Sequence, residues 1–236
     1  MNQIHLALDI ARIVLVYVVY GSYGISYLFM ASKILIRNPN RLSYLLGGFY
    51  ISGGGGVIIN FIYTFIYLEI ILSILYHITI FLLLLSLIFL FLFVFTLNKS
   101  EKLLSPRFIV GVIIIYAFFE VLICFIPNGV EISAATDWRP IWSFTFFISV
   151  FIIGNFAIIP TFYYSIRMYL QFSDMILKKK WKYFLIGIMG YIFLFYGGII
   201  MLVWGDPLVR QIWSYMSILS LPFVYLIYNS IGKTLH

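Results

Sequence analysis

Long apolar runs separated by short charged connections dominate this chain. Each run has about 20 residues or more, the length that an α-helix needs to cross the hydrocarbon core of a bilayer. They do not show the alternation over about ten residues that is typical of a membrane β-barrel strand. The pattern therefore predicts an all-α membrane protein with one domain, residues 1–236, of seven transmembrane helices. We expect these helices at about residues 10–34, 43–68, 70–97, 108–127, 141–166, 183–204 and 211–231.

The charges indicate how the helices are oriented. If the N-terminus lies outside, all of the 15 Lys and Arg residues except Arg12, Arg139 and Arg210 lie on the inner side. An excess of basic residues in short cytoplasmic loops is the usual signal for orientation in a membrane. We therefore expect the N-terminus outside and the C-terminus inside. Most acidic residues lie on the predicted outer side: Asp9, Glu69, Glu131, Asp137 and Asp206.

Four consecutive glycines lie in the second predicted helix: Gly53, Gly54, Gly55 and Gly56. Each glycine costs a helix roughly 1 kcal/mol relative to alanine, so neighbouring groups must compensate. One interpretation is close packing of other helices against the glycines. The other is a hinged or interrupted helix beside a substrate path, as in transporters.

A similar glycine pair, Gly197 and Gly198, lies in the sixth predicted helix. The match suggests an internal repeat in which two groups of three helices flank a linking fourth helix.

Pro160 and Pro222 lie inside the fifth and seventh predicted helices, where each frees a backbone carbonyl group. With Asn155 and the serines at 214, 217 and 220, these positions are candidates for lining a cavity.

Glu120 is the only carboxylate inside a predicted helix, and Tyr116 shares its helix face at a spacing of four residues. Ionisable residues inside a membrane are rare and usually face a bundle interior or a watery cavity. We expect either a proton-titrating or cation-binding group, or a neutral, hydrogen-bonded structural glutamate. Asn60 and His77 lie at a similar depth, so the three side chains form one candidate ligand site in the outer half of the membrane.

A basic cluster lies in the longest inner connection: Lys178, Lys179, Lys180 and Lys182. Because 64% of the chain is hydrophobic and only 10% is charged, this cluster favours contact with anionic membrane lipids over nucleic acid. The alternative is a docking surface for a cytoplasmic partner.

Motifs for catalysis, cofactors and metals do not appear in the sequence. It contains no Gly-x-Ser-x-Gly, His-Glu-x-x-His or Walker loop, and the last predicted helix has no internal lysine for a retinal Schiff base. One histidine, one carboxylate and one cysteine inside helices make a poor metal-ligand set. We therefore expect a non-enzymatic protein without a cofactor or metal.

Residues 35–42, Leu-Ile-Arg-Asn-Pro-Asn-Arg-Leu, precede a helix rich in Gly and Phe. This passage and the seven-helix topology resemble the N-terminal sensor domains of many microbial histidine kinases. The resemblance implies a sensing module in a prokaryotic plasma membrane. Because this sequence ends at His236 without a kinase, we expect signalling to require a separate partner. The arrangement of three, one and three helices is also similar to small sugar transporters with two triple-helix bundles.

Three functional hypotheses follow. The first is a receptor or sensor-like module that binds a small apolar or amphipathic ligand near Asn60, His77 and Glu120. The second is a small solute transporter or proton-coupled carrier in which Glu120 titrates. The third is an accessory subunit whose glycine-rich helix packs against another membrane subunit.

Overall fold

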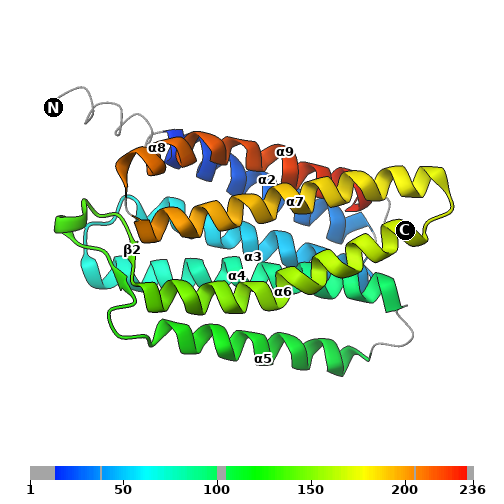
Figure 1. Cartoon of the computed structure of the whole chain (residues 1–236), viewed down its shortest axis with the longest axis horizontal. Helices are drawn as coiled ribbons and strands as arrows, with labels where there is room; N and C mark the ends of the chain where they lie inside the picture. Colours follow the sequence, from blue (N-terminus) through cyan, green and yellow to red (C-terminus); the bar gives the residue numbers. More distant parts are fainter. Residues whose placement is uncertain (1–13, 38, 100–104, 205, 233–236) are drawn as a thin grey trace.

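The computed structural model describes residues 14–37, 39–99, 105–204 and 206–232, and within these ranges the fold is almost entirely helical. Long helices run side by side along the molecule, and a loop containing two short strands lies at one end (Figure 1). Six helices are long and apolar enough to cross a membrane, judged by length and composition among the described residues. These six are α3 (Arg41–Tyr63), α4 (Glu69–Lys99), α5 (Pro106–Cys124), α6 (Phe144–Gln171), α7 (Met175–Trp204) and the segment Pro207–Ile231.

Shorter elements complete the described chain. The first helical segment is a π-helical stretch, η1 (Val14–Tyr20), that continues into α2 (Gly21–Arg37). Strands β1 (Val130–Glu131) and β2 (Ile141–Trp142) pair antiparallel on either side of the 3₁₀ turn η2 (Ala134–Thr136). The last segment consists of α8 (Pro207–Met216), η3 (Ser217–Leu219), α9 (Ser220–Ile227) and η4 (Tyr228–Gly232).

Local capping residues explain where several helices begin. The side chain of Asn40 accepts a hydrogen bond from the backbone N–H of Ser43, 2.8 Å away, at the start of α3. Ser105 caps α5 in the same way, with Pro106 in the first helical position, where its missing N–H costs nothing. Ser143 caps α6, and Asp206 caps α8. Each cap satisfies backbone N–H groups that have no partner inside the helix.

The structure changes several of the predicted helix bounds. Predicted helix 43–68 ends at Tyr63, because residues 64–68 form the turn to α4, which starts at Glu69. Predicted helix 141–166 starts later, at Phe144, since Ile141 and Trp142 pair with β1. Predicted helix 211–231 is interrupted at η3. Residues 10–13 of the first predicted helix lie outside the described residues.

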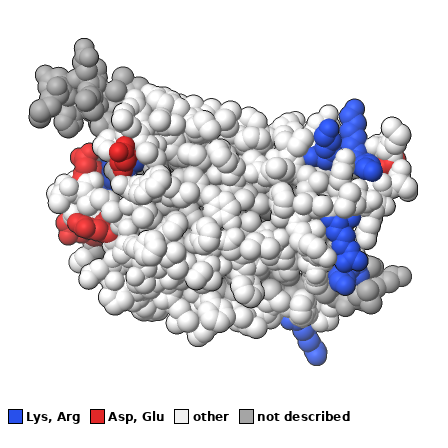
Figure 2. Space-filling model, in the orientation of Figure 1, with Lys and Arg blue, Asp and Glu red and all other residues white. Residues whose placement is uncertain are grey.

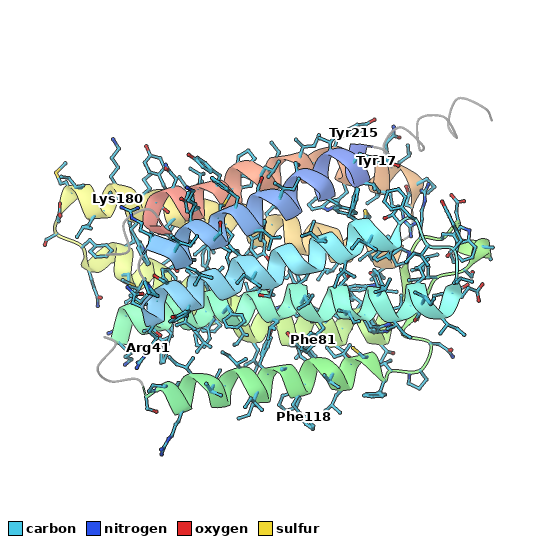
Figure 3. All side chains as sticks on the ribbon, turned by 180° about the vertical axis from the view of Figure 1, so that it is seen from behind. Tyr17, Arg41, Phe81, Phe118, Lys180 and Tyr215 are labelled. Atoms are coloured by element: carbon cyan, nitrogen blue, oxygen red, sulfur yellow. The ribbon has the colours of Figure 1, made fainter. Side chains whose placement is uncertain are left out.

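Helix α3 lies between α2 and α4, while α7 packs against α6, α8 and α9. Helices α4 and α6 contact each other and join these two groups. Helix α5 contacts α4 and α6 and lies at the edge of the bundle (Figure 1). Its outward side chains are apolar: Phe118, for example, is 59% exposed and points away from the other helices (Figure 3). That face is suited to contact with lipid.

Glycines let α3 approach both neighbours closely. A Cβ atom built at Gly53 would lie 2.6 Å from Cε1 of Tyr27 on α2, and one at Gly54 would lie 2.8 Å from Cβ of Tyr27. On the other side, a Cβ at Gly56 would lie 3.1 Å from the carbonyl oxygen of Thr79 on α4. Helix α3 continues unbroken through all four glycines, so here they serve as packing positions and the helix has no interruption.

The two prolines have different effects. Pro160 lies inside α6, which continues as one helix from Phe144 to Gln171. Pro222 lies near the start of α9, directly after the 3₁₀ turn η3. Because proline cannot donate a backbone hydrogen bond to the residue four positions earlier, the change to 3₁₀ geometry beside Pro222 has a local cause.

Charged side chains separate to the two ends of the bundle. Figure 2 shows acidic groups at the end that carries the β1–β2 loop and mainly basic groups at the opposite end, with a wide uncharged band between them. The four lysines of the basic cluster belong to α7, which starts at Met175, so they lie on a helix and not in a long connection as predicted. Lys180 and Arg41 both lie at the basic end (Figure 3).

The contact between α2 and α3 generates the first prediction. In Gly53→Ala, the new methyl group would collide with the buried ring of Tyr27, and overpacking of this kind costs about 1–3 kcal/mol. We expect a lower midpoint of thermal unfolding for the purified protein in mild detergent. The matched control is Gly111→Ala on α5, where a Cβ atom would meet nothing within 4 Å. An unchanged midpoint for Gly53→Ala would contradict the close approach of the two helices.

Candidate functional site

One cavity of the described structure has a volume of about 340 Å³ and lies at the end of the bundle near the β1–β2 loop. Its walls come from η1, α2, α3, α4, α6, α7, α8, η3 and the start of α9, and residues of the loop lie over it. The volume falls near the lower end of the range of about 300–1,000 Å³ that is typical of small-molecule sites. Of the residues predicted as ligand candidates, only Asn60 lines it.

Tyrosines form much of the cavity wall. Tyr20, Tyr23 and Tyr27 follow one another at helical spacing on η1 and α2, so they project from the same helix face. The rings of Tyr23 and Tyr27 stack with their centroids 5.5 Å apart. Three further tyrosines line the cavity from α3, α4 and α7: Tyr63, Tyr76 and Tyr191.

The hydroxyl groups of these tyrosines differ in their partners. The Tyr76 hydroxyl accepts a hydrogen bond of 2.7 Å from Nε1 of Trp142, which fixes the loop strand against α4. The Tyr191 hydroxyl lies 3.0 Å from Oγ of Ser86. The Tyr23 hydroxyl is buried and has no hydrogen-bond partner among the described residues. It is therefore available to a polar atom of a bound molecule.

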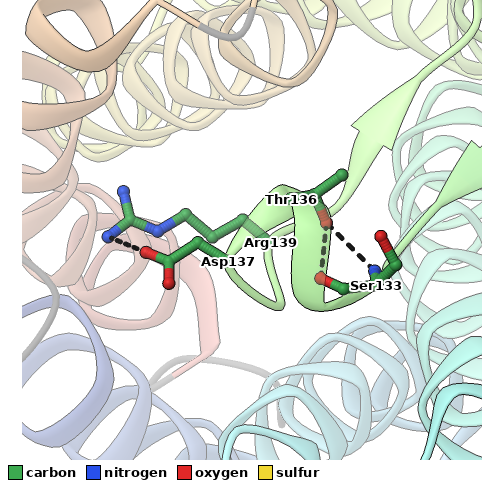
Figure 4. A network of polar contacts seen from close by, with 4 residues as sticks. All are labelled: Ser133, Thr136, Asp137 and Arg139. Atoms are coloured by element: carbon green, nitrogen blue, oxygen red, sulfur yellow. Dashed lines mark hydrogen bonds and ion pairs between the residues drawn. The ribbon is translucent and has the colours of Figure 1, made fainter.

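The loop between β1 and β2 covers the cavity. It turns tightly through η2, where the backbone N–H of Ser133 donates to Oγ1 of Thr136, 3.0 Å away (Figure 4). Asp137 and Trp138 both have a φ of 57°, a left-handed conformation that costs a bulky residue about 1–2 kcal/mol. The hydrogen bond from the Trp138 N–H to the Ser133 carbonyl, 2.9 Å long, stabilises this geometry. The strained backbone places Trp138, Arg139 and Pro140 over the cavity.

Two arginines face the cavity at its covered end. Arg139 comes from the loop, and Nη2 of Arg139 lies 3.4 Å from Oδ2 of Asp137. Arg210 comes from α8, and its Nη2 donates to the Pro140 carbonyl over 3.4 Å. The Nε atoms of both arginines are buried without a hydrogen-bond partner among the described residues. Both guanidinium groups therefore retain unused donors in a partly dry site.

Serines from α8, η3 and α9 supply the other polar surface. Ser214, Ser217 and Ser220 all line the cavity, as the sequence predicted for this run. Their hydroxyl groups donate to backbone carbonyls of the preceding turn, those of Arg210, Ser214 and Ser217. Asn60 faces them from α3 and interacts with the hydroxyl of Tyr20.

The predicted grouping of Asn60, His77 and Glu120 does not occur in the structure. His77 lies on another face of α4, where its Nδ1 donates to the Ser73 carbonyl over 2.7 Å and its ring contacts Phe146 of α6. Glu120 lies in α5, and α5 does not reach the cavity. The helices are rotated so that these side chains point in different directions.

Tyr116 and Asn155 also lie away from the cavity, at contacts between helices. The Tyr116 hydroxyl donates to the Ile153 carbonyl, 3.1 Å away, which joins α5 to α6. Oδ1 of Asn155 accepts a 2.6 Å hydrogen bond from the Tyr196 hydroxyl, which joins α6 to α7. The prediction that Asn155 lines a cavity with the serines is therefore wrong for this cavity.

Of the predicted packing or hinge positions, Gly198 lines the cavity. A Cβ atom at the preceding Gly197 would overlap the ring of Trp213, so this glycine makes room for the tryptophan that closes the wall between α7 and α8. The glycines of α3 and both prolines are not part of the lining. Within the described residues, no group of three His, Cys, Asp or Glu side chains is arranged to hold a metal ion.

The aromatic and arginine residues of the cavity were not predicted from the sequence. Arg139 and Arg210 were expected only in the outer connections between helices, and nothing in the sequence indicated that they line a cavity. The spacing of Tyr20, Tyr23 and Tyr27 on one face of the first helix was the available signal. Tyrosine is common at membrane interfaces, however, so this spacing alone does not identify a cavity.

Comparison of the chain with models of known protein families, with curated proteins and with solved structures found no match.

Glu120 leads to a stability prediction. Its side chain is 1% exposed, and neither carboxylate oxygen has a hydrogen-bond partner among the described residues. An unsatisfied buried polar group costs about 1–3 kcal/mol, so Glu120→Met, which has a similar volume, should raise the midpoint of thermal unfolding by several degrees. Glu120→Gln keeps a polar group and should change the midpoint less. A lower midpoint in Glu120→Met would reveal a stabilising partner of the carboxyl group.

Proposed function

We propose that this chain is a seven-helix membrane module that binds a small apolar or amphipathic molecule in the cavity beneath the β1–β2 loop. The single observation that carries the proposal is the cavity itself. It is enclosed by most of the helices, is lined mainly by aromatic and aliphatic side chains, and contains a few polar groups. Such a combination is typical of small-molecule binding sites.

The proposed topology has the N-terminus and the β1–β2 loop outside a prokaryotic plasma membrane and the basic cluster inside. The separation of charges in Figure 2 supports it, since positive side chains favour the cytoplasmic side. The segment Val14–Arg37, formed by η1 and α2, serves as the first of the seven spans beside the six longer apolar helices. In this topology the cavity lies in the outer half of the membrane, beneath the loop.

A sensor-like role is favoured over a carrier that uses Glu120. Glu120 lies on α5 at the edge of the bundle and does not line the cavity, so protonation there has no direct contact with a bound molecule. The cavity wall, by contrast, includes helices α3 and α7, and α7 begins with the basic cluster at the opposite end. Ligand binding can thus change the packing of helices that continue to the inner surface, where a cytoplasmic partner would read the change.

The topology is testable by labelling with a membrane-impermeant maleimide on intact cells. In a Cys124→Ser background, Ala135→Cys in the loop should be labelled, because its side chain is exposed and predicted to lie outside. Lys179→Cys, which is equally exposed on α7, should be labelled only after the membrane is permeabilised. Labelling of Lys179→Cys on intact cells, with labelling of Ala135→Cys only after permeabilisation, would contradict the orientation.

The cavity is testable with an uncharged probe, tritiated 1-decanol, added to the protein in phosphatidylcholine nanodiscs, with empty nanodiscs as the background. We expect saturable binding to the wild type and its loss in Val57→Trp, since Val57 lines the cavity and the larger ring would fill it. The matched control is Ile51→Trp on the same helix, at a position that is 47% exposed and outside the lining. Absence of saturable binding to the wild type would refute the proposed function.

A further inference from the structure

We propose, building on the ligand-binding function, that the cavity takes an anionic amphiphile with a single hydrocarbon chain. Its negatively charged head binds between Arg139 and Arg210, and its chain lies among the tyrosines and aliphatic side chains below. The class therefore includes medium-chain carboxylates and related single-chain anions.

The cavity lining carries a net positive charge. Arg139 and Arg210 contribute two positive charges, and among the described residues that line the cavity there is no Asp or Glu. The acidic neighbour of Arg139, Asp137, has a side chain that is 76% exposed, so solvent screens much of its attraction. The covered end of the cavity is therefore an electropositive site.

The two guanidinium groups have hydrogen-bond donors that the described residues do not use. Each carries five N–H donors, and the contacts that Arg139 makes with Asp137 and Arg210 with Pro140 are long, at 3.4 Å each. The Nε atom of each is buried and has no hydrogen-bond partner in the part of the chain that the structure describes. Two guanidinium groups with free donors suit a carboxylate or a similar oxyanion, which accepts short charge-assisted hydrogen bonds from arginine.

The two arginines lie at the same end of the cavity. Arg210 donates to the carbonyl of Pro140, the residue that follows Arg139, and both arginines line the cavity, so their positive charges repel each other. Like charges repel more strongly where the protein excludes water. An anion bound between the two arginines offsets this repulsion, which favours a negatively charged head at this end of the cavity.

The rest of the cavity suits a hydrocarbon chain. Away from the arginines the lining is largely apolar and includes Leu83 and Leu84 of α4 and Leu194 and Ile199 of α7. Leu84 lies about 22 Å from the start of α4 at Glu69, at 1.5 Å per residue, so the apolar part extends well into the bundle. A volume of about 340 Å³ favours one hydrocarbon chain over the two chains of a phospholipid.

The decisive experiment compares two probes with the same chain length, decanoate and 1-decanol. Binding of each tritiated probe is measured to the full chain in phosphatidylcholine nanodiscs at about pH 8, where a carboxylate is ionised. We expect the wild type to bind decanoate about tenfold or more tightly than 1-decanol, because only the carboxylate forms charge-assisted hydrogen bonds. Raising the salt concentration should weaken the binding of decanoate alone.

The variants Arg139→Gln and Arg210→Gln should each remove most of the preference for decanoate while the binding of 1-decanol is unchanged. Retained 1-decanol binding also shows that a variant is folded. The matched control is Arg107→Gln, an exposed arginine at the opposite end of the bundle, which should behave as the wild type. If a glutamine variant binds neither probe, Arg139→Lys or Arg210→Lys takes its place, and a retained decanoate preference supports the proposal.

The other outcomes separate the two proposals. If decanoate and 1-decanol bind equally, or if the preference survives in both glutamine variants, the arginine site is refuted and the apolar cavity stands. If neither probe binds saturably to the wild type, both proposals fail. Phosphatidylglycerol in the nanodiscs is an anionic lipid that can compete with decanoate. If it lowers decanoate binding, and does so only when both arginines are present, the site binds a lipid headgroup and the proposal of a single-chain ligand is overturned. Unchanged decanoate affinity in those nanodiscs supports it.

Discussion

The contact between the ring of Tyr27 and the backbone of Gly53 and Gly54 is the interaction on which the rest of the structure depends. Helices in a bilayer gain little from burying apolar surface against one another, so their association relies on close van der Waals packing. Here the absence of side chains on α3 lets a large, rigid ring on α2 lie directly against its backbone. The same ring contacts Tyr50, whose hydroxyl donates to the Val224 carbonyl over 3.0 Å and so ties α3 to α9. One glycine-rich surface thereby connects elements from both ends of the sequence.

Most polar side chains inside the bundle are satisfied locally, as a low-dielectric environment requires. Thr79, Thr161 and Ser230 each donate to a carbonyl group of the preceding turn of their own helix. Buried polar atoms without a partner among the described residues also occur away from the cavity, for example in Ser43, Thr96 and Glu120. Those of Tyr23, Arg139 and Arg210 differ in that all three residues line the same cavity. These donors make the cavity suited to a ligand that carries hydrogen-bond acceptors as well as apolar surface.

Much of the fold followed from local sequence signals. The apolar runs, the capping residues Ser105 and Asp206 and the prolines that follow them mark most helix ends to within about five residues, because caps and hydrophobic length act over a single turn or a single helix. The start of α7 is an exception, since the helix begins at Met175 and not at residue 183. The candidate site was predicted less well. Depth in the membrane can be read from residue number at 1.5 Å per residue, but the direction of a side chain depends on how each helix is rotated against its neighbours. Asn60 therefore faces the cavity, whereas His77 faces Phe146.

By itself, the sequence determined that this protein is built of long apolar helices with charges separated between the connections, since these properties depend only on composition and spacing along the chain. It also showed that the second long helix has a surface without side chains at four consecutive glycines, but it left open whether other helices pack there or the helix is interrupted. Only the tertiary structure decided which residues share a cavity. Tyr23 and Arg210 are separated by most of the chain, and the loop that carries Arg139 is placed by a hydrogen bond between Trp142 and Tyr76. Contacts of this kind arise from the packing of distant segments, for which the local pattern contains no information.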